Sequence, residues 1–243
     1  MNLVILQPMF IPWAGVFEQI KLADTFVHYD DALLPKGRSF ISRVQIKATE
    51  GVRWLTIPID HVRSGRLLKD TWIHASPTWR RKHLETLRHC YSKAPYFEDM
   101  FDLAQEIYSI PSNNLLDFNC HGIARLCTFL KLSPHFVFSS DLSTQGTSTE
   151  KLVNISCTLQ ANTYITGHGA LNYLDHSQFE DHDINVHYMD YKKLPYPQLH
   201  GTFTPFVSIL DGIANCGNSA SHLLCSNAIY WKDFINESRR TIR

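Results

Sequence analysis

LVILQPMFIPWAGVFEQIKLADTFVHYDD, residues 3–31, decides the fold class. Leu3 to Leu6 is a short apolar run that predicts a buried strand, and the apolar spacing from Val16 to Ala23 predicts a helix. Thr25 to Tyr29 is rich in residues that favour strands. A strand, a short helix and a second strand in this order predict a βαβ unit with parallel strands and a right-handed crossover.

Later segments extend the α/β pattern. Helical spacing over residues 77–131 predicts a helical block of three helices, with Ser112 or Asn113 as the N-cap of the third. Residues 42–47 and 52–59 predict a β-hairpin. Short strands are expected at 136–138, 163–166 and 184–188, helices at 150–159 and 170–176, and a helical region near the end. We therefore predict a single α/β domain over residues 1–243, with three layers around a mostly parallel, Rossmann-like sheet, a helical insert and a β-hairpin excursion.

Composition limits the classes of partner. Lys plus Arg and Asp plus Glu both number 23, whereas a general nucleic-acid or acidic-membrane binder usually carries a basic excess. Neither an apolar run approaching 18 residues nor a signal peptide is found, so no membrane span is expected. The six cysteines form no CxxC pair and predict reduced thiols in a cytoplasmic protein. Clustered Cys/His spacings are absent, so no metal site is predicted.

The loop from Gln7 to Gly15 links the first strand to the first helix. Ligands of open α/β sheets bind beyond the carboxyl ends of strands, where helix N–H groups are unpaired. Gln7 offers an amide there, Pro8 stiffens the loop, and Gly15 allows close approach of the backbone. A rigid turn without a ligand fits the same residues equally well. The loop lacks GxGxxG and the paired histidines of adenylyl-transferring α/β enzymes.

A basic run follows Asp30 and Asp31, and few acids oppose it: Lys36, Arg38, Arg43 and Lys47. Such cations suit a phosphate or carboxylate, which Arg binds bidentately. The two aspartates have three candidate roles, namely pairing with these cations, which is the commonest, binding Mg²⁺ and orienting a hydroxyl. The alternative for the whole run is a solvated hairpin face.

Two later stretches carry further polar candidates. His168, between Gly167 and Gly169 at a strand-to-helix junction, suits a general base or a ligand contact, and its alternative is a surface histidine. Residues 196–217 place polar side chains among aromatics and prolines. Ser208 and Asp211 are three residues apart and share a helical face, and their alternative is helix capping. This stretch contributes Gln198, Ser208, Asp211 and Asn215.

Several motifs occur in order along the chain. Residues 7–15 read Q-P-x-[FY]-[IL]-P-W-x-G, residues 36–47 read K-x-R-S-F-x-x-R-x-x-I-K after D-D at 30–31, and residues 54–58 read W-L-T-[IV]-P. Further matches lie at 91–97, 164–174, 196–198 and 208–217. Together they resemble the WbqC-like protein family over nearly the whole chain.

The resemblance implies a cytoplasmic bacterial enzyme of lipopolysaccharide O-antigen or related surface-polysaccharide biosynthesis. We hypothesise a transferase that adds an acyl or aminoacyl group, such as glycyl, to the amine of a nucleotide-linked amino sugar. Its partners would be that sugar nucleotide and an activated acyl or aminoacyl donor, with an acyl carrier as one form of the donor, and no resident cofactor follows. The candidate catalytic residues are His168, Asp211 and Asp30. The candidate binding residues are Gln7, Pro8, Gly15, Asp31, Lys36, Arg38, Arg43, Lys47, Gln198, Ser208 and Asn215.

Two other functions stay open from the sequence. The first is nucleotidyl or adenylyl transfer, which the strand-loop-helix opening favours and the missing paired histidines disfavour. The second is a non-catalytic module that binds a sugar nucleotide. Release of pyrophosphate from a nucleoside triphosphate would identify the first, and ligand binding without turnover would identify the second.

Overall fold

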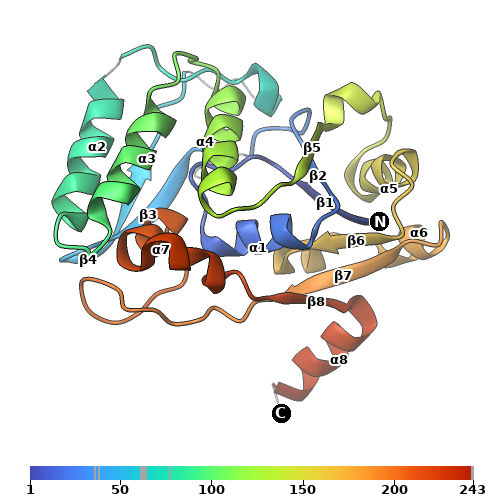
Figure 1. Ribbon diagram of the computed structural model, residues 1–243. Helices are drawn as coiled ribbons and strands as arrows, with labels where there is room; N and C mark the ends of the chain where they lie inside the picture. Colours follow the sequence, from blue (N-terminus) through green and yellow to red (C-terminus); the bar gives the residue numbers. More distant parts are fainter. Residues whose placement is uncertain (36, 38, 61–64, 77, 242–243) are drawn as a thin grey trace.

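The computed structural model describes residues 1–35, 37, 39–60, 65–76 and 78–241, which form an α/β fold (Figure 1). The described residues build a six-stranded sheet in the order β5-β2-β1-β6-β7-β8. Neighbours from β5 to β7 are parallel, and β8 is antiparallel to β7. The mostly parallel, Rossmann-like sheet is thus confirmed. The strands are β1 (Asn2–Leu6), β2 (Thr25–His28), β5 (His135–Phe138), β6 (Thr163–Thr166), β7 (Asn185–Asp190) and β8 (Asn227–Tyr230).

Both faces of this sheet are covered, which makes three layers. Along β1, Val4 belongs to one apolar core, whereas Leu3 and Ile5 belong to a second, because successive side chains of a strand point to opposite faces. The first core includes side chains of α1 (Ala14–Leu22) and α4 (Leu115–Phe129). The second includes side chains of α5 (Ser148–Thr158) and α6 (His176–Glu180). Burial on both faces explains why the central strands read as continuous apolar runs.

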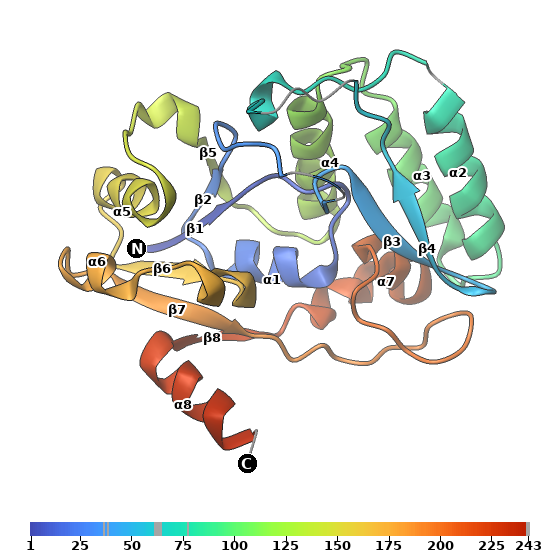
Figure 2. The same cartoon turned by 180° about the vertical axis from the view of Figure 1, so that it is seen from behind.

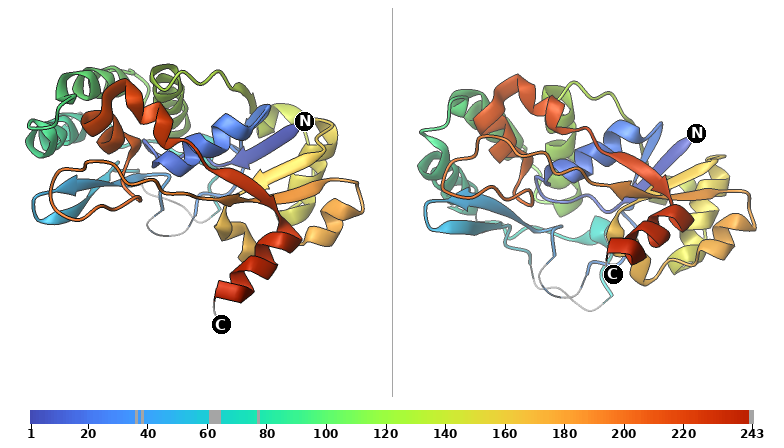
Figure 3. Two further views of the ribbon diagram at one scale, coloured as in Figure 1. Left: turned by 60° about the horizontal axis from the view of Figure 1, so that its bottom comes forward. Right: turned by 90° about the horizontal axis from the view of Figure 1, so that it is seen from below.

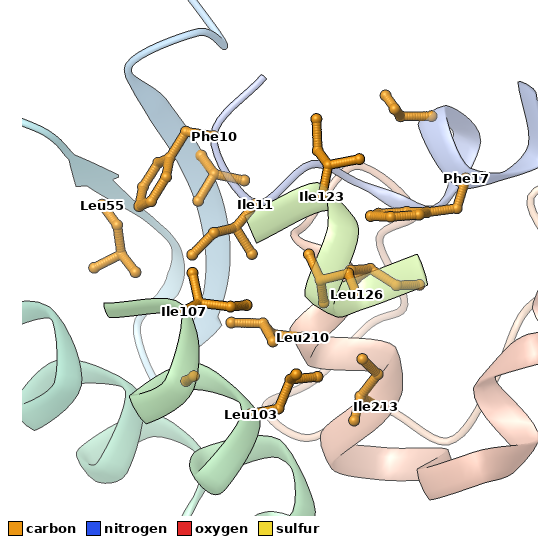
Figure 4. Close-up of a cluster of buried hydrophobic side chains, with 14 of the residues drawn as sticks. Phe10, Ile11, Phe17, Leu55, Leu103, Ile107, Ile123, Leu126, Leu210 and Ile213 are labelled. Carbon is orange, nitrogen blue, oxygen red and sulfur yellow. The ribbon is translucent and has the colours of Figure 1, made fainter. Parts of the chain in front are cut away.

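The helical insert and the hairpin lie at one end of the molecule (Figures 1 and 2). α3 (Phe97–Tyr108) lies between α2 (Thr78–Tyr91) and α4, and α7 (Ile209–Cys216) packs on α3 (Figure 1). Leu103 and Ile107 of α3 face Leu210 and Ile213 of α7 in the shared core (Figure 4). The hairpin pairs β3 (Arg43–Ala48) with β4 (Gly51–Thr56) in antiparallel register, as predicted.

Three expectations about local structure were wrong. The N-cap of α4 is Asn114, whose side chain accepts hydrogen bonds from the N–H groups of Leu116 and Asp117. Residues 170–176 do not form one helix, because a 3₁₀ turn, η3 (His168–Asn172), ends before Asp175 caps the separate helix α6. The helical region predicted near the end is present as α7, η4 (Gly217–Leu223) and α8 (Trp231–Thr241), but strand β8, which was not predicted, interrupts it.

Two shorter 3₁₀ turns, η1 (Leu68–Asp70) and η2 (Ser139–Leu142), complete the elements. α8 extends away from the edge of the sheet (Figure 3). Its first turns stay attached, because Trp231 stacks on His176 and Phe234 stacks on Tyr188. None of the helices in the described ranges is both long and apolar enough to cross a bilayer.

Candidate functional site

A cleft of about 550 Å³ opens at the carboxyl ends of β1 and β6. These two strands are neighbours, but the chain leaves β1 towards β2 on one side and leaves β6 towards β7 on the other. Diverging crossovers of this kind define the point where open α/β sheets bind ligands. Leu6 and Thr166, the last residues of the two strands, both line the cleft. Its position and volume suit a small-molecule ligand.

Aromatic side chains form most of the cleft wall. The ring of Trp13 lies 4.9 Å from that of Tyr191 and 5.5 Å from that of Phe206, measured between centroids. Phe40 and Tyr173 also line the cleft, and Phe40, Tyr173 and Phe206 are each about half exposed. Large apolar rings left open to solvent around a concavity typically mark a binding surface. Such rings bind the apolar faces of sugars and the planes of bases.

The opening loop is held rigidly beside this wall. Ser208 donates from Oγ to the carbonyl of Ile11 over 2.8 Å, and the N–H of Ile209 donates to the carbonyl of Pro12 over 2.9 Å. Asn119 donates to the carbonyl of Pro8 over 2.9 Å. Ile11 has a φ of 38°, which is strained for a β-branched residue and persists only where neighbouring contacts fix it. The loop therefore holds Trp13 in a fixed place.

Gly15 is required by the position of Trp13. A Cβ added at Gly15 would lie 2.3 Å from two atoms of the indole, so any side chain there would displace the ring. The sequence predicted that Gly15 allows close approach to the backbone. In the structure the group that approaches Gly15 is the indole of Trp13. Pro8 is buried, and Gln7 donates from its amide to the carbonyl of Leu33 over 3.0 Å. Neither residue is among those lining the cleft.

Polar groups are few and concentrate on one side of the cleft. Gln19 of α1 is 4% exposed and donates from Nε2 to the phenolic oxygen of Tyr191 over 2.9 Å. Gly167 lies against this pair, since an added Cβ would be 3.1 Å from the Tyr191 oxygen. Burial, followed by the charge of Glu18, raises the pKa of Tyr191, so the phenol stays protonated at neutral pH.

His168 lines the cleft beside Tyr191, with the two ring centroids 5.2 Å apart. Its Nε2 lies 2.6 Å from the carbonyl of Met189. Because a carbonyl only accepts, Nε2 carries the proton, and Nδ1 of the neutral ring keeps its lone pair. In this tautomer Nδ1 can accept a hydrogen bond or a proton.

The described residues that line the cleft include no Asp or Glu. Lys193 is the cation among them, and its ammonium lies 5.2 Å from the centre of the Phe206 ring. The N-terminus of α1 begins at the cleft residue Trp13, with no acidic residue in its first turn and no side-chain cap. The positive end of that helix is therefore uncompensated, so the electrostatics favour a neutral or anionic ligand.

Asp211 lies outside the cleft, in a buried polar network. It is 0% exposed and accepts hydrogen bonds from Tyr91 over 2.9 Å, Tyr196 over 2.7 Å and Gln198 over 2.8 Å. Burial raises the pKa of Asp211, partly opposed by these hydrogen bonds and by the charge of Lys47. Lys47 in turn donates to Gln198 over 3.0 Å. The network ties the hairpin, α2 and α7 to residues 196–204.

Two other predicted residues belong to the same region of α7. Ser208 is the N-cap of the helix and accepts from the N–H of Leu210, which confirms the capping alternative. Asn215 donates to the backbone carbonyl of Asp211 over 2.8 Å, one turn earlier. Both side chains act on the geometry of the helix, and neither lines the cleft.

Asp30 and Asp31 link the end of β2 to η2 and α5. Asp30 is buried and accepts from the hydroxyls of Ser139 and Ser140, over 2.9 and 2.7 Å. Asp31 pairs with Lys151 of α5 at 2.5 Å. Burial pushes the pKa of Asp31 upward, but hydrogen bonds from Lys151 and Ser139 outweigh it and hold the pKa below its ordinary value. Within the described ranges the aspartates thus bind the β5 to α5 segment.

The basic run is only partly described. Lys36 and Arg38 lie outside the described residues. Arg43 stacks its guanidinium 3.8 Å from the centre of the Trp54 ring, and Lys47 is buried in the Asp211 network. Neither lines the cleft. Phosphate binding by these four cations therefore stays a prediction.

Sequence reasoning missed most of the cleft. The loop that contains Trp13 was predicted to shape a pocket, but no role was predicted for Gln19, Phe40, Tyr191, Lys193 or Phe206, because isolated aromatic residues are usually core and single polar residues are usually surface. One signal was available, since Trp13 and Phe206 lie in segments where prolines interrupt the core periodicity. In the described ranges, no three His, Cys, Asp or Glu side chains gather closely enough to share a metal ion.

Comparison with known proteins finds a matching family profile and a similar protein sequence. The profile of the WbqC-like protein family matches residues 7–223. The chain is 32% identical to a protein described as "Uncharacterized protein Rv1507c" from Mycobacterium tuberculosis (strain ATCC 25618 / H37Rv), over 226 residues that cover 92% of this chain and 97% of that protein. No solved structure matches at a significant level. With a family profile matched over most of its length, the chain belongs to the WbqC-like protein family.

Proposed function

We propose that this protein is a transferase that uses the cleft between β1 and β6 to acylate or aminoacylate the amine of a nucleotide-linked amino sugar. The observation that carries the proposal is the composition of the cleft. It combines a stacking wall of Trp13, Tyr191 and Phe206 with one available base, His168, and its described lining contains no carboxylate. The role in bacterial surface-polysaccharide biosynthesis rests on the family resemblance.

The absence of a carboxylate among the described lining residues matters because an amine attacks only when it carries no extra proton. A carboxylate beside the amine would stabilise the ammonium form, which has no lone pair. An apolar wall disfavours the ammonium form, since burial penalises charge. Lys193 and the N-terminus of α1 are the described groups suited to the pyrophosphate of the sugar nucleotide.

The proposed step is a nucleophilic acyl substitution. The amine nitrogen attacks the carbonyl carbon of an activated donor, such as a thioester, and forms a C–N bond. His168 takes the proton from that nitrogen at Nδ1. The C–S bond of the donor breaks, and the thiolate leaves and receives the proton. The products are an N-acylated sugar nucleotide and a free thiol.

Mass spectrometry of reactions with purified protein tests the proposal. We expect an N-acylated product from at least one pairing of a nucleotide-linked amino sugar with a thioester or aminoacyl donor. His168→Ala should lower its rate at least a hundredfold, the usual contribution of a general base. The matched control is His182→Ala, because His182 is exposed in the turn that follows α6 and does not line the cleft. Absence of product over a broad panel of donors and sugars contradicts transfer, and binding without turnover leaves a sugar-nucleotide binding module.

A further inference from the structure

The hydrogen bond between Gln19 and Tyr191 leaves the hydroxyl proton of Tyr191 as a hydrogen-bond donor for a ligand in the cleft. The Tyr191 oxygen accepts from Gln19 Nε2 over 2.9 Å, so the hydroxyl proton of Tyr191 is not used in this bond and can be donated to a different acceptor. No acceptor for that proton is found among the described residues. Tyr191 lines the cleft, and its ring is held between Trp13 and His168.

Gly167 keeps the approach to this hydroxyl open. It lies at the carboxyl end of β6, where any Cβ would stand 3.1 Å from the Tyr191 oxygen and 3.9 Å from Gln19 Nε2. A methyl group there would occupy the space from which a ligand oxygen could reach the phenol. Glycine thus leaves a small gap beside a partly buried, oriented donor.

We propose that Tyr191 donates its hydroxyl hydrogen bond to the acyl oxygen of the transferred group, with Gln19 as the residue that positions it. This deepens the proposed function and rests on it. His168 and Tyr191 stand side by side, so an amine that gives its proton to His168 places the carbonyl under attack next to the phenol. The carbonyl electrons move onto that oxygen as the C–N bond forms, and Tyr191 stabilises the negative charge while keeping its own proton.

The same hydrogen bond would form with the N-acyl group of the product, so simple sugars test it without a donor. N-Acetylglucosamine carries the acyl oxygen, and glucose lacks it while matching the ring and its neutral charge. We expect wild-type protein to bind N-acetylglucosamine about fivefold more tightly than glucose in a ligand-observed NMR titration, the worth of one neutral hydrogen bond.

Tyr191→Phe keeps the ring and removes the hydroxyl, and should abolish this preference. Gly167→Ala keeps the hydroxyl and blocks its approach, and should abolish it as well, so the test does not depend on one variant folding. Tyr230→Phe is the control, because Tyr230, on β8, donates to Glu180 of α6 and does not line the cleft. It should retain the preference.

Equal binding of the two sugars by wild-type protein, binding of neither, or a preference that survives Tyr191→Phe overturns the assignment. The proposed function fails separately. If the preference depends on Tyr191 but no acyl product forms, transfer is contradicted and the acyl-oxygen donor stands. If product forms and neither its rate nor the sugar preference depends on Tyr191, only the donor role falls.

Discussion

Lys47 donates a hydrogen bond from its ammonium to Gln198 Oε1 over 3.0 Å, which joins the β3–β4 hairpin to a segment 151 residues later. Gln198 also donates to Asp211, and that carboxylate is fully buried. The segment fixed in this way, residues 191–208, carries Tyr191, Lys193 and Phe206 into the cleft. The Asp211 network thus positions a wall of the candidate site without touching a ligand.

Asp211→Asn should destabilise the protein by about 2–4 kcal/mol, because an amide cannot accept all the hydrogen bonds that the carboxylate receives and leaves Lys47 buried without its counter-charge. Urea unfolding measures the change. Asp102→Asn is the control, since Asp102 is exposed on α3. A variant that is as stable as the wild type but inactive would contradict this structural role and support the catalytic role predicted for Asp211 from the sequence.

Gly15→Ala should destabilise the protein by about 1–3 kcal/mol, because its methyl group would overlap the indole of Trp13. A double-mutant cycle with Trp13→Ala tests this cause. Since the clash needs both groups, adding Gly15→Ala to Trp13→Ala should cost much less than adding it to the wild type. Gly169→Ala serves as the control, because nothing lies within 4 Å of a Cβ at that position. Additive effects of the two substitutions would contradict the clash.

Ser208→Ala should cost about 1–2 kcal/mol, because it removes both the N-cap of α7 and the hydrogen bond to Ile11. Ile11 then loses a contact that holds its strained backbone, so the opening loop should exchange amide hydrogens faster. Hydrogen exchange of residues 8–13 checks this. Ser221→Ala, whose hydroxyl donates to the carbonyl of Asn218 within the same turn, should leave exchange in that loop unchanged.

Stability should fall as the pH drops from about 6.5 towards 4. Burial lowers the pKa of both His28 and His83 to about 4 in the folded chain, although the charge of Asp30 acts to raise that of His28. Protons then bind preferentially to the unfolded chain, so stability is present above pH 6.5 and is lost as pH falls through that window. Each histidine contributes up to about 3 kcal/mol.

His28→Phe removes one of these groups and keeps an aromatic ring stacked on Phe136. The variant should lose less stability than the wild type between pH 6.5 and 4 in urea titrations. His222→Gln, at an exposed position, should follow the wild-type curve. Parallel curves for His28→Phe and the wild type would show that His28 is not responsible.

The fold was predictable from the sequence where local periodicity and burial agree. β1, α1 and β2 form one unit whose apolar spacing is regular, and β3 pairs with β4 across a short turn. β8 was missed because its four residues run directly into α8, so strand and helix patterns merge. The break before α6 was missed because Asp175 caps a new helix inside an otherwise helical pattern.

The site was harder to predict because its members come together only in three dimensions. His168 was found, since glycines isolate it at a strand end. Trp13 and Phe206 meet across 193 positions of sequence, because backbone contacts of Ile11, Pro12 and Trp13 with residues 208–209 bring the two segments together. Asp30, Asp31 and Asp211 drew attention as charges, but each is occupied by partners in the structure. Charge in a sequence does not distinguish a buried network from a ligand contact.

The pairing of β1 with β6 also has a consequence for biosynthesis of the chain. One edge of β1 has no partner until residues 163–166 have left the ribosome, so a central strand stays open while two thirds of the protein is made. Tyr191 and Phe206 arrive later still. A truncated or stalled chain therefore lacks part of the cleft wall, and its unpaired β1 edge favours pairing with strands of other chains.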